Sequence, residues 1–154
     1  MYHITVLKNE LVHYLVQNPT GLYLDATAGG GGHSEALLEK FPDITVISSD
    51  WDYEAIKECQ QRLARFEDRS IILHSSFNRL AENLTQMGLK SLDGIAADFG
   101  TSQDQLLHRE GFSFQYDSFL DMRMSTSHTK ILAVDVLRSA SEKELADIFF
   151  LLWK

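Results

Sequence analysis

The chain has 154 residues, of which 44% are hydrophobic, and this length fits one domain with a substantial core. Its net charge of −8 argues against a broad basic surface for nucleic acid, although a local basic patch or a ribosomal partner still permits such a substrate. We expect a cytoplasmic protein without a signal peptide or membrane segment, because no suitable apolar run occurs and the single cysteine, Cys59, excludes an internal disulfide.

Apolar runs alternate with helix-forming stretches along the first hundred residues. The expected strands are 21–26, 44–49, 70–74 and 92–99. The expected helices are 8–17, 33–40, 52–66 and 77–87. In the third of these helices Asp52 is a candidate cap, and Ile56, Cys59 and Leu63 are expected to face inward as packed residues. Strands separated by helices predict parallel βαβ units with right-handed crossovers.

The pattern changes after residue 100. Residues 101–130 are polar and aromatic without a clear period, which predicts a long loop region of the kind that often carries function. Helices are expected at 131–138 and 142–153, the second with a capping box formed by Ser141 and Glu144. We therefore divide the chain into a core (1–100), an active-site loop region (101–130) and the start of a truncated helical subdomain (131–154).

Four consecutive glycines, Gly29–Gly32, lie between the first predicted strand and the next helix. Such a loop lets the backbone approach a ligand closely, and α/β proteins bind nucleotide-like cofactors there. Asp50 ends the second strand, 21 residues after Gly29, at the position where an acid binds ribose hydroxyls. The alternative for Asp50 is a turn or helix-cap residue.

The residues flanking the glycines favour one cofactor over another. A nicotinamide dinucleotide motif requires glycine where Ser34 stands. Asp25, just before the loop, instead suits the cationic amino-acid end of S-adenosylmethionine, with Asp50 on the ribose. No cluster with metal-ligand spacing is seen in the sequence.

Three further residues are candidates for the same site. His33 begins the first crossover helix, where it either shapes the loop or contacts the cofactor. Phe77 follows the third strand and either covers the adenine or belongs to the core. Asp98 ends the fourth strand, where a carboxylate can orient an exocyclic nucleobase amine for attack on a methyl group, or can simply cap the strand.

At these residues the chain resembles the bacterial ribosomal RNA small-subunit methyltransferase H family, also called MraW, over nearly its whole length. The matching segments are His3–Leu7, Asp25–Thr27, Gly31–Ser34, Ser49–Asp52, Arg109–Phe114 and Leu120–Met124. The resemblance implies an α/β, Rossmann-like class I S-adenosylmethionine-dependent methyltransferase fold. We expect a partial doubly wound parallel sheet in the order 3-2-1-4, followed by C-terminal helices.

The resemblance also implies an activity, since members of that family use S-adenosylmethionine to methylate the N4 amine of a cytidine in 16S ribosomal RNA of the small subunit. The implied cofactor contacts are Gly31, Gly32, His33, Asp50, Phe77, Asp98 and Gln105. Contact of Asp98 with the target amine then becomes a secondary hypothesis. Asp121 and Arg123 are candidate catalytic residues that shape the target-base pocket, and their alternative is a salt bridge that folds the loop.

The chain departs from the family pattern at Gly30, where an arginine is usual, and in length, since family members are roughly twice as long. Two other functions therefore stay open, namely a non-catalytic cofactor-binding remnant or interaction protein, and a small-molecule methyltransferase. Without later strands, residues 92–99 are expected to form an exposed sheet edge that can pair in a homodimer.

Overall fold

The computed structural model describes residues 5–126 and 128–152, except for the side chains of residues 103 and 104. His3 and Ile4, which the family resemblance includes, lie outside the described residues. Internal contacts divide the chain into two compact units, residues 1–102 and residues 103–154, and each is described by itself.

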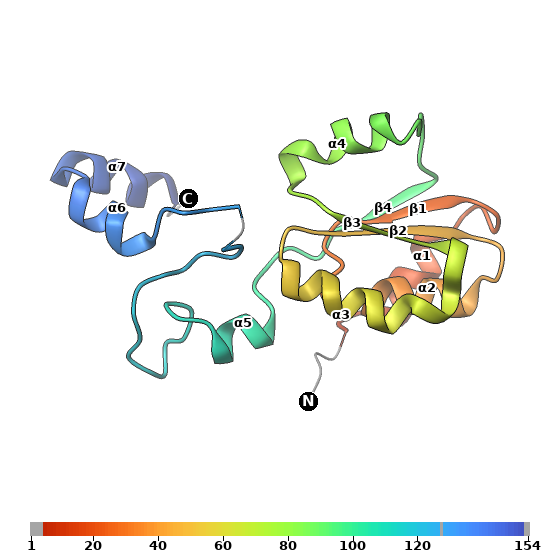
Figure 1. Cartoon of the computed structure of the whole chain (residues 1–154), viewed down its shortest axis with the longest axis horizontal. Helices are drawn as coiled ribbons and strands as arrows, with labels where there is room; N and C mark the ends of the chain where they lie inside the picture. Colours follow the sequence, from red (N-terminus) through yellow and green to blue (C-terminus); the bar gives the residue numbers. More distant parts are fainter. Residues whose placement is uncertain (1–4, 127, 153–154) are drawn as a thin grey trace. The chain divides into compact units, whose positions relative to one another are not determined.

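The first unit contains a parallel sheet of four strands (Figure 1). The strands are β1 (Leu22–Asp25), β2 (Thr45–Asp50), β3 (Ser70–His74) and β4 (Gly94–Ala96). They lie in the order β3-β2-β1-β4, and every neighbouring pair is parallel. This order confirms the predicted Rossmann-like, partial doubly wound sheet, in which the carboxyl ends of the strands meet at one edge.

Helices cover both faces of this sheet (Figure 1). One face carries α1 (Lys8–Leu15), α2 (Gly32–Lys40) and α3 (Tyr53–Leu63), and the other carries α4 (Phe77–Gln86). Because successive strand residues point to opposite faces, Tyr23 joins the core beneath the first three helices while Leu24 joins the core beneath α4. Both side chains are buried, so β1 forms the centre of the hydrophobic core.

The fourth strand is shorter than predicted, since β4 ends at Ala96 rather than near residue 99. Among the described residues its only strand neighbour is β1, which ends at Asp25, and one more hydrogen bond, from Ala26 N to Ala96 O, follows. Each residue of a strand needs a hydrogen-bonding partner on the neighbouring strand. Residues 97–100 therefore leave the sheet, and they are exposed. Ile95 is 59% exposed, as expected for a sheet edge.

The helix after β2 begins as predicted but ends earlier. Asp52 caps α3, because its carboxylate accepts a hydrogen bond of 3.2 Å from Glu54 N. The α-helix ends at Leu63, and the chain continues as the 3₁₀ helix η1 (Ala64–Arg69) rather than as the same helix to residue 66. The residues predicted to face inward are all buried, namely Ile56, Cys59 and Leu63.

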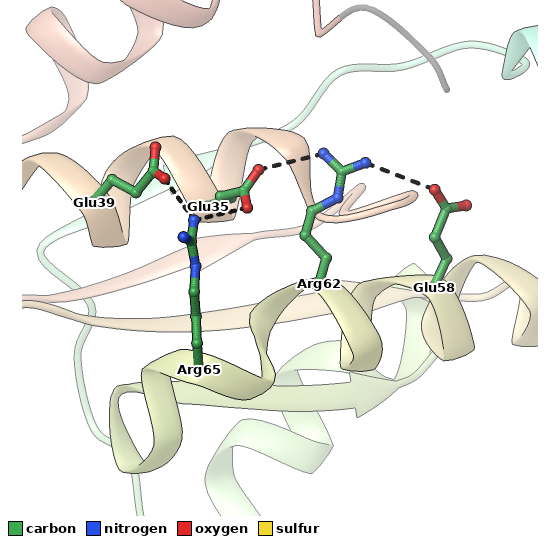
Figure 2. Close-up of polar contacts among 5 residues, drawn as sticks. All are labelled: Glu35, Glu39, Glu58, Arg62 and Arg65. Carbon is green, nitrogen blue, oxygen red and sulfur yellow. Dashed lines mark hydrogen bonds and ion pairs between the residues drawn. The ribbon is translucent and has the colours of Figure 1, made fainter. Parts of the chain in front are cut away.

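A charge ladder joins α2 to α3 and η1 (Figure 2). Arg62 bridges Glu35 and Glu58, with N–O distances of 3.4 and 3.7 Å. Arg65 bridges Glu35 and Glu39. Because the two arginines alternate with the three glutamates, each arginine is shared by two carboxylates. Glu35 lies in the first turn of α2, so the ladder orients the helix that directly follows the glycines.

The second unit contains α5 (Gln103–His108), α6 (Ala133–Ser139) and α7 (Glu142–Leu152). The last two confirm predicted helices, and the predicted capping box is present, because Glu144 N donates to Ser141 Oγ and Ser141 N donates to Glu144 Oε2. The short helix α5 corrects the expectation of irregular structure throughout 101–130; six residues are too few to reveal a helical period. No helix within residues 5–126 and 128–152 is long and apolar enough to cross a membrane.

Candidate functional site

The glycine loop, residues 29–32, connects the carboxyl end of β1 to α2. Gly29 and Gly31 have φ angles of 51° and 82°, in the left-handed region that glycine adopts without steric penalty. Gly31 N donates to Ala28 O at 2.7 Å, which closes a turn, and α2 begins at Gly32 without a side-chain cap. At this edge of the sheet the loop therefore presents backbone rather than side chains.

Asp50 holds the glycine loop from the end of β2. One carboxylate oxygen accepts a hydrogen bond of 2.8 Å from Gly29 N, and the other accepts one of 2.9 Å from Asp52 N. The turn role considered for Asp50 is therefore present in the structure. Asp50 is also partly exposed, and each carboxylate oxygen has a second lone pair, so acceptor capacity remains for the hydroxyls of a ligand.

Asp25 lies beneath the loop and is only 1% exposed. Its carboxylate accepts hydrogen bonds of 2.8 Å from Ser34 Oγ and 3.3 Å from Thr27 N. Ser48 Oγ donates in turn to Ser34 Oγ at 2.8 Å, which completes a buried polar chain. This position corrects the expectation that Asp25 orders the amino-acid end of a cofactor, because the carboxylate is closed off by the loop and α2.

The burial of Asp25 gives a signed pH dependence. Desolvation raises the pKa of Asp25 above its ordinary value of 3.8, outweighing the hydrogen bond from Ser34. A carboxyl group whose pKa is raised by folding stabilises the folded state fully at pH values below its unfolded-state pKa. This stabilisation is lost as the pH rises through the folded-state pKa.

We expect the free energy of unfolding of the wild type, minus that of Asp25→Asn, to fall as the pH is raised from about 4 to about 8. Asparagine does not titrate in this range, so the trend isolates the ionisation of Asp25. Urea unfolding at a series of pH values measures this difference. A difference that increases over the same range would show that hydrogen bonding to the carboxylate outweighs its desolvation.

Cys59 of α3 packs against the other side of the loop. A Cβ built on Gly31 would lie 3.0 Å from Cys59 Sγ, so the thiol fills the space beside the glycine. Burial raises the pKa of Cys59 to about 12, which keeps the thiol neutral at physiological pH. Cys59 is therefore a packed residue, as predicted.

Phe77 and Asp98 lie just after β3 and β4. Phe77 begins α4 and is 55% exposed, which excludes the core alternative, and its ring meets the Phe99 ring edge-on at 5.6 Å between centroids. Asp98 is exposed, and its backbone N donates to Thr27 Oγ1 at 2.6 Å. The structure thus brings both predicted site residues to the edge of the sheet where Asp50 lies.

His33 is buried at the start of α2, with its ring Nε2 2.9 Å from Val6 O. Of the two alternatives considered for this residue, the structure shows a contact within the chain that shapes the loop.

The remaining predicted site residues belong to the second unit. Gln105 lies on α5 and is buried. The Arg123 side chain donates two hydrogen bonds to Asp121, from Nε at 2.6 Å and from a terminal nitrogen at 2.7 Å. This pairing lowers the pKa of Asp121. A further bond of 3.3 Å from Arg123 to Thr129 O ties the pair to the chain beyond it, so the salt-bridge alternative is present.

Two contacts at the glycine loop were not predicted. The Thr27 hydroxyl holds the segment after β4, and Thr5 lies against Gly32. Both are contacts between residues far apart in sequence, so no spacing rule indicates them. The only available signal was that Thr27 and Thr5 both fall within segments that carry the family resemblance.

Comparisons with known proteins identify the family of the chain. The model of the MraW methylase family matches residues 1–152. A protein of Carboxydothermus hydrogenoformans named ribosomal RNA small subunit methyltransferase H is 42% identical over 149 residues, covering 96% of this chain and 47% of the relative. The protein of that name from Caldicellulosiruptor bescii is 43% identical over 148 residues, covering 95% and 48%.

Among solved structures, a putative rRNA methylase from Clostridium thermocellum matches with a TM-score of 0.42 and 18% identity, covering 49% of this chain and 41% of that one. The chain spans about half the length of the curated relatives it matches.

Proposed function

The chain belongs to the MraW methylase family, and from this membership we propose that it binds S-adenosylmethionine and methylates ribosomal RNA of the small subunit. Family membership and sheet order together identify the class I S-adenosylmethionine-dependent methyltransferase fold. The observation that carries the proposal is the glycine loop tied to Asp50 at the carboxyl edge of the sheet, where open α/β sheets bind ligands. Such a substrate implies a cytoplasmic protein.

The residues at this edge suit the proposed cofactor. Asp50 has acceptor capacity for the ribose hydroxyls, the loop allows close backbone approach, and the exposed ring of Phe77 offers a face for adenine. When bound, S-adenosylmethionine supplies an electrophilic methyl group. The full set of proposed contacts is Gly31, Gly32, His33, Asp50, Phe77, Asp98 and Gln105.

The proposed target is the N4 amine of a cytidine in 16S ribosomal RNA. The lone pair of such an amine is delocalised into the ring, so a carboxylate that accepts one of its N–H bonds orients it and stabilises developing charge. The exposed carboxylate of Asp98 is suited to this role. Asp121 and Arg123, already joined to each other, are proposed to shape the pocket for the base.

A second candidate is a protein that binds the cofactor without transferring its methyl group. One observation favours it: the Asp121 carboxylate is already paired with Arg123. A ribosomal substrate requires recognition of a large RNA surface, and the net charge of −8 works against that recognition.

Two measurements test these candidates. Calorimetry with S-adenosylmethionine tests the cofactor site, and we expect saturable binding at one site. Transfer of a labelled methyl group to small ribosomal subunits that lack the modification tests the activity. Binding with transfer supports the methyltransferase, binding without transfer supports the second candidate, and absence of binding overturns both.

We also propose that β4 pairs with β4 of a second copy, because an exposed parallel edge offers unpaired backbone groups. Light scattering coupled to gel filtration is expected to give the mass of a dimer. A monomer over the accessible concentration range would contradict this pairing.

A further inference from the structure

Glycine is required at position 32 for a steric reason that lies outside the glycine loop. A Cβ built on Gly32 would lie 2.0 Å from Thr5 Oγ1 and 3.2 Å from Thr5 Cβ. The φ angle of Gly32 is not in the left-handed region, so its backbone conformation alone does not require glycine. The position excludes larger residues because the side chain of Thr5 occupies the space where their Cβ would lie.

A hydrogen bond lies next to this crossing. His33 Nε2 is 2.9 Å from Val6 O, and since a carbonyl oxygen only accepts, the imidazole carries its proton on Nε2. His33 as a whole is 8% exposed, so the bond is sheltered from water. Two consecutive residues at the start of α2 therefore contact two consecutive residues of the N-terminal segment.

The segment is also fixed at its other end. Leu7 has φ 51° and ψ 32°, a left-handed conformation that costs a non-glycine residue about 1–2 kcal/mol. This residue turns the chain directly into α1, where Leu11 N donates to Leu7 O at 2.9 Å and Val12 is buried in the core. The strained turn persists because contacts on both sides hold it.

We propose that residues 5–7, the N-terminal strap, hold the glycine loop in its cofactor-binding conformation, with Thr5 as a positioning residue and the hydrogen bond between His33 and Val6 O as the tie between the strap and α2. The proposal rests on the proposed cofactor site. The strap and Asp50 hold the two ends of one short loop, and the proposed cofactor contacts this loop, so by linkage the strap and the cofactor each stabilise the bound state of the other. The strap contacts Gly32 and His33, whereas Asp50 holds Gly29.

A rescue experiment tests whether the missing side chain of Gly32 serves the strap or leaves space for the cofactor, which the backbone of Gly32 is proposed to contact in either case. Gly32→Ala is expected to weaken S-adenosylmethionine binding by roughly 10-fold or more, because the added methyl displaces the strap. Thr5→Gly removes the three atoms that lie nearest to the added methyl. In the double variant Gly32→Ala/Thr5→Gly we expect affinity within about threefold of Thr5→Gly alone.

The matched control is Gly30→Ala, which adds a methyl to the same loop but faces the flexible Glu58 carboxylate instead of the strap. Thr5→Gly should not change the effect of Gly30→Ala. The proposal is overturned if the double variant at positions 5 and 32 binds as weakly as Gly32→Ala, because the missing side chain of Gly32 then leaves space for the cofactor and not for the strap.

A second readout follows the strap itself. Amide hydrogen exchange of residues 6–8 is expected to slow when S-adenosylmethionine binds to the wild-type chain, and to slow less in Thr5→Gly. Unchanged exchange despite binding would contradict the coupling. Failure of the wild type to bind would instead overturn the proposed function and the positioning role with it, while non-additive Tm values for the variants at positions 5 and 32 would still report their contact.

Discussion

Asp50→Ala is expected to weaken the binding of S-adenosylmethionine by about 100-fold or more. A hydrogen bond to a charged acceptor contributes about 1.5–3 kcal/mol, and two ribose hydroxyls would lose theirs together. The substitution also frees Gly29 N, which Asp50 holds at 2.8 Å, so the loop loses its tie to β2. Calorimetry on the purified variant measures the loss of affinity.

Two variants separate the parts of this effect. Asp50→Asn keeps one acceptor oxygen and removes the charge, so an intermediate loss is expected. Asp52→Ala removes the cap of α3, which costs about 1 kcal/mol of stability, and leaves the acceptors of Asp50 in place. Unchanged affinity in Asp50→Ala would show that the ribose is bound elsewhere.

Gly31→Ala is expected to lower the free energy of unfolding by about 2–5 kcal/mol. The φ angle of 82° costs an alanine about 1–2 kcal/mol, and the contact of 3.0 Å between its methyl and Cys59 Sγ adds an overpacking cost of about 1–3 kcal/mol. Urea unfolding at neutral pH measures the sum. Because Gly31 precedes α2, we also expect weaker cofactor binding.

The chain offers a matched control for the backbone part. Gly88 has φ 78° but no atom within 4 Å of its Cβ position, so Gly88→Ala is expected to show the conformational cost alone. In a Cys59→Ala background, Gly31→Ala should lower the free energy of unfolding by less, because most of the packing cost is then absent. Equal losses at positions 31 and 88 would mean that the thiol moves aside freely.

The sheet could be predicted because its signals are local. Each buried strand is an apolar run bounded by turn residues, and strands alternating with helices leave little choice but a parallel sheet. Asp50 could be predicted as a site residue for the same reason, since the ends of strands and the glycines indicate where the carboxyl edge of the sheet lies. Phe77 and Asp98 follow from that edge, although their exposure could not be read from the sequence.

The errors concern contacts between distant segments. Asp25 reads as a ligand-facing acid because it precedes the glycines, but Ser34 and Ser48 close over it from two other elements. The length of β4 depends on where β1 ends, which the composition of residues 92–99 does not encode. The contact between Thr5 and Gly32 likewise arises only when the N-terminal segment folds onto α2.

The burial of the single cysteine has a practical consequence. Cys59 is fully buried beside Gly31, and its thiol stays protonated in the native state. A thiol reagent therefore reacts only with molecules whose core has opened around α3 and the glycine loop. In the unmodified chain, the rate of alkylation therefore measures how often this region opens. A ligand that slows alkylation stabilises this region, which indicates that it binds there.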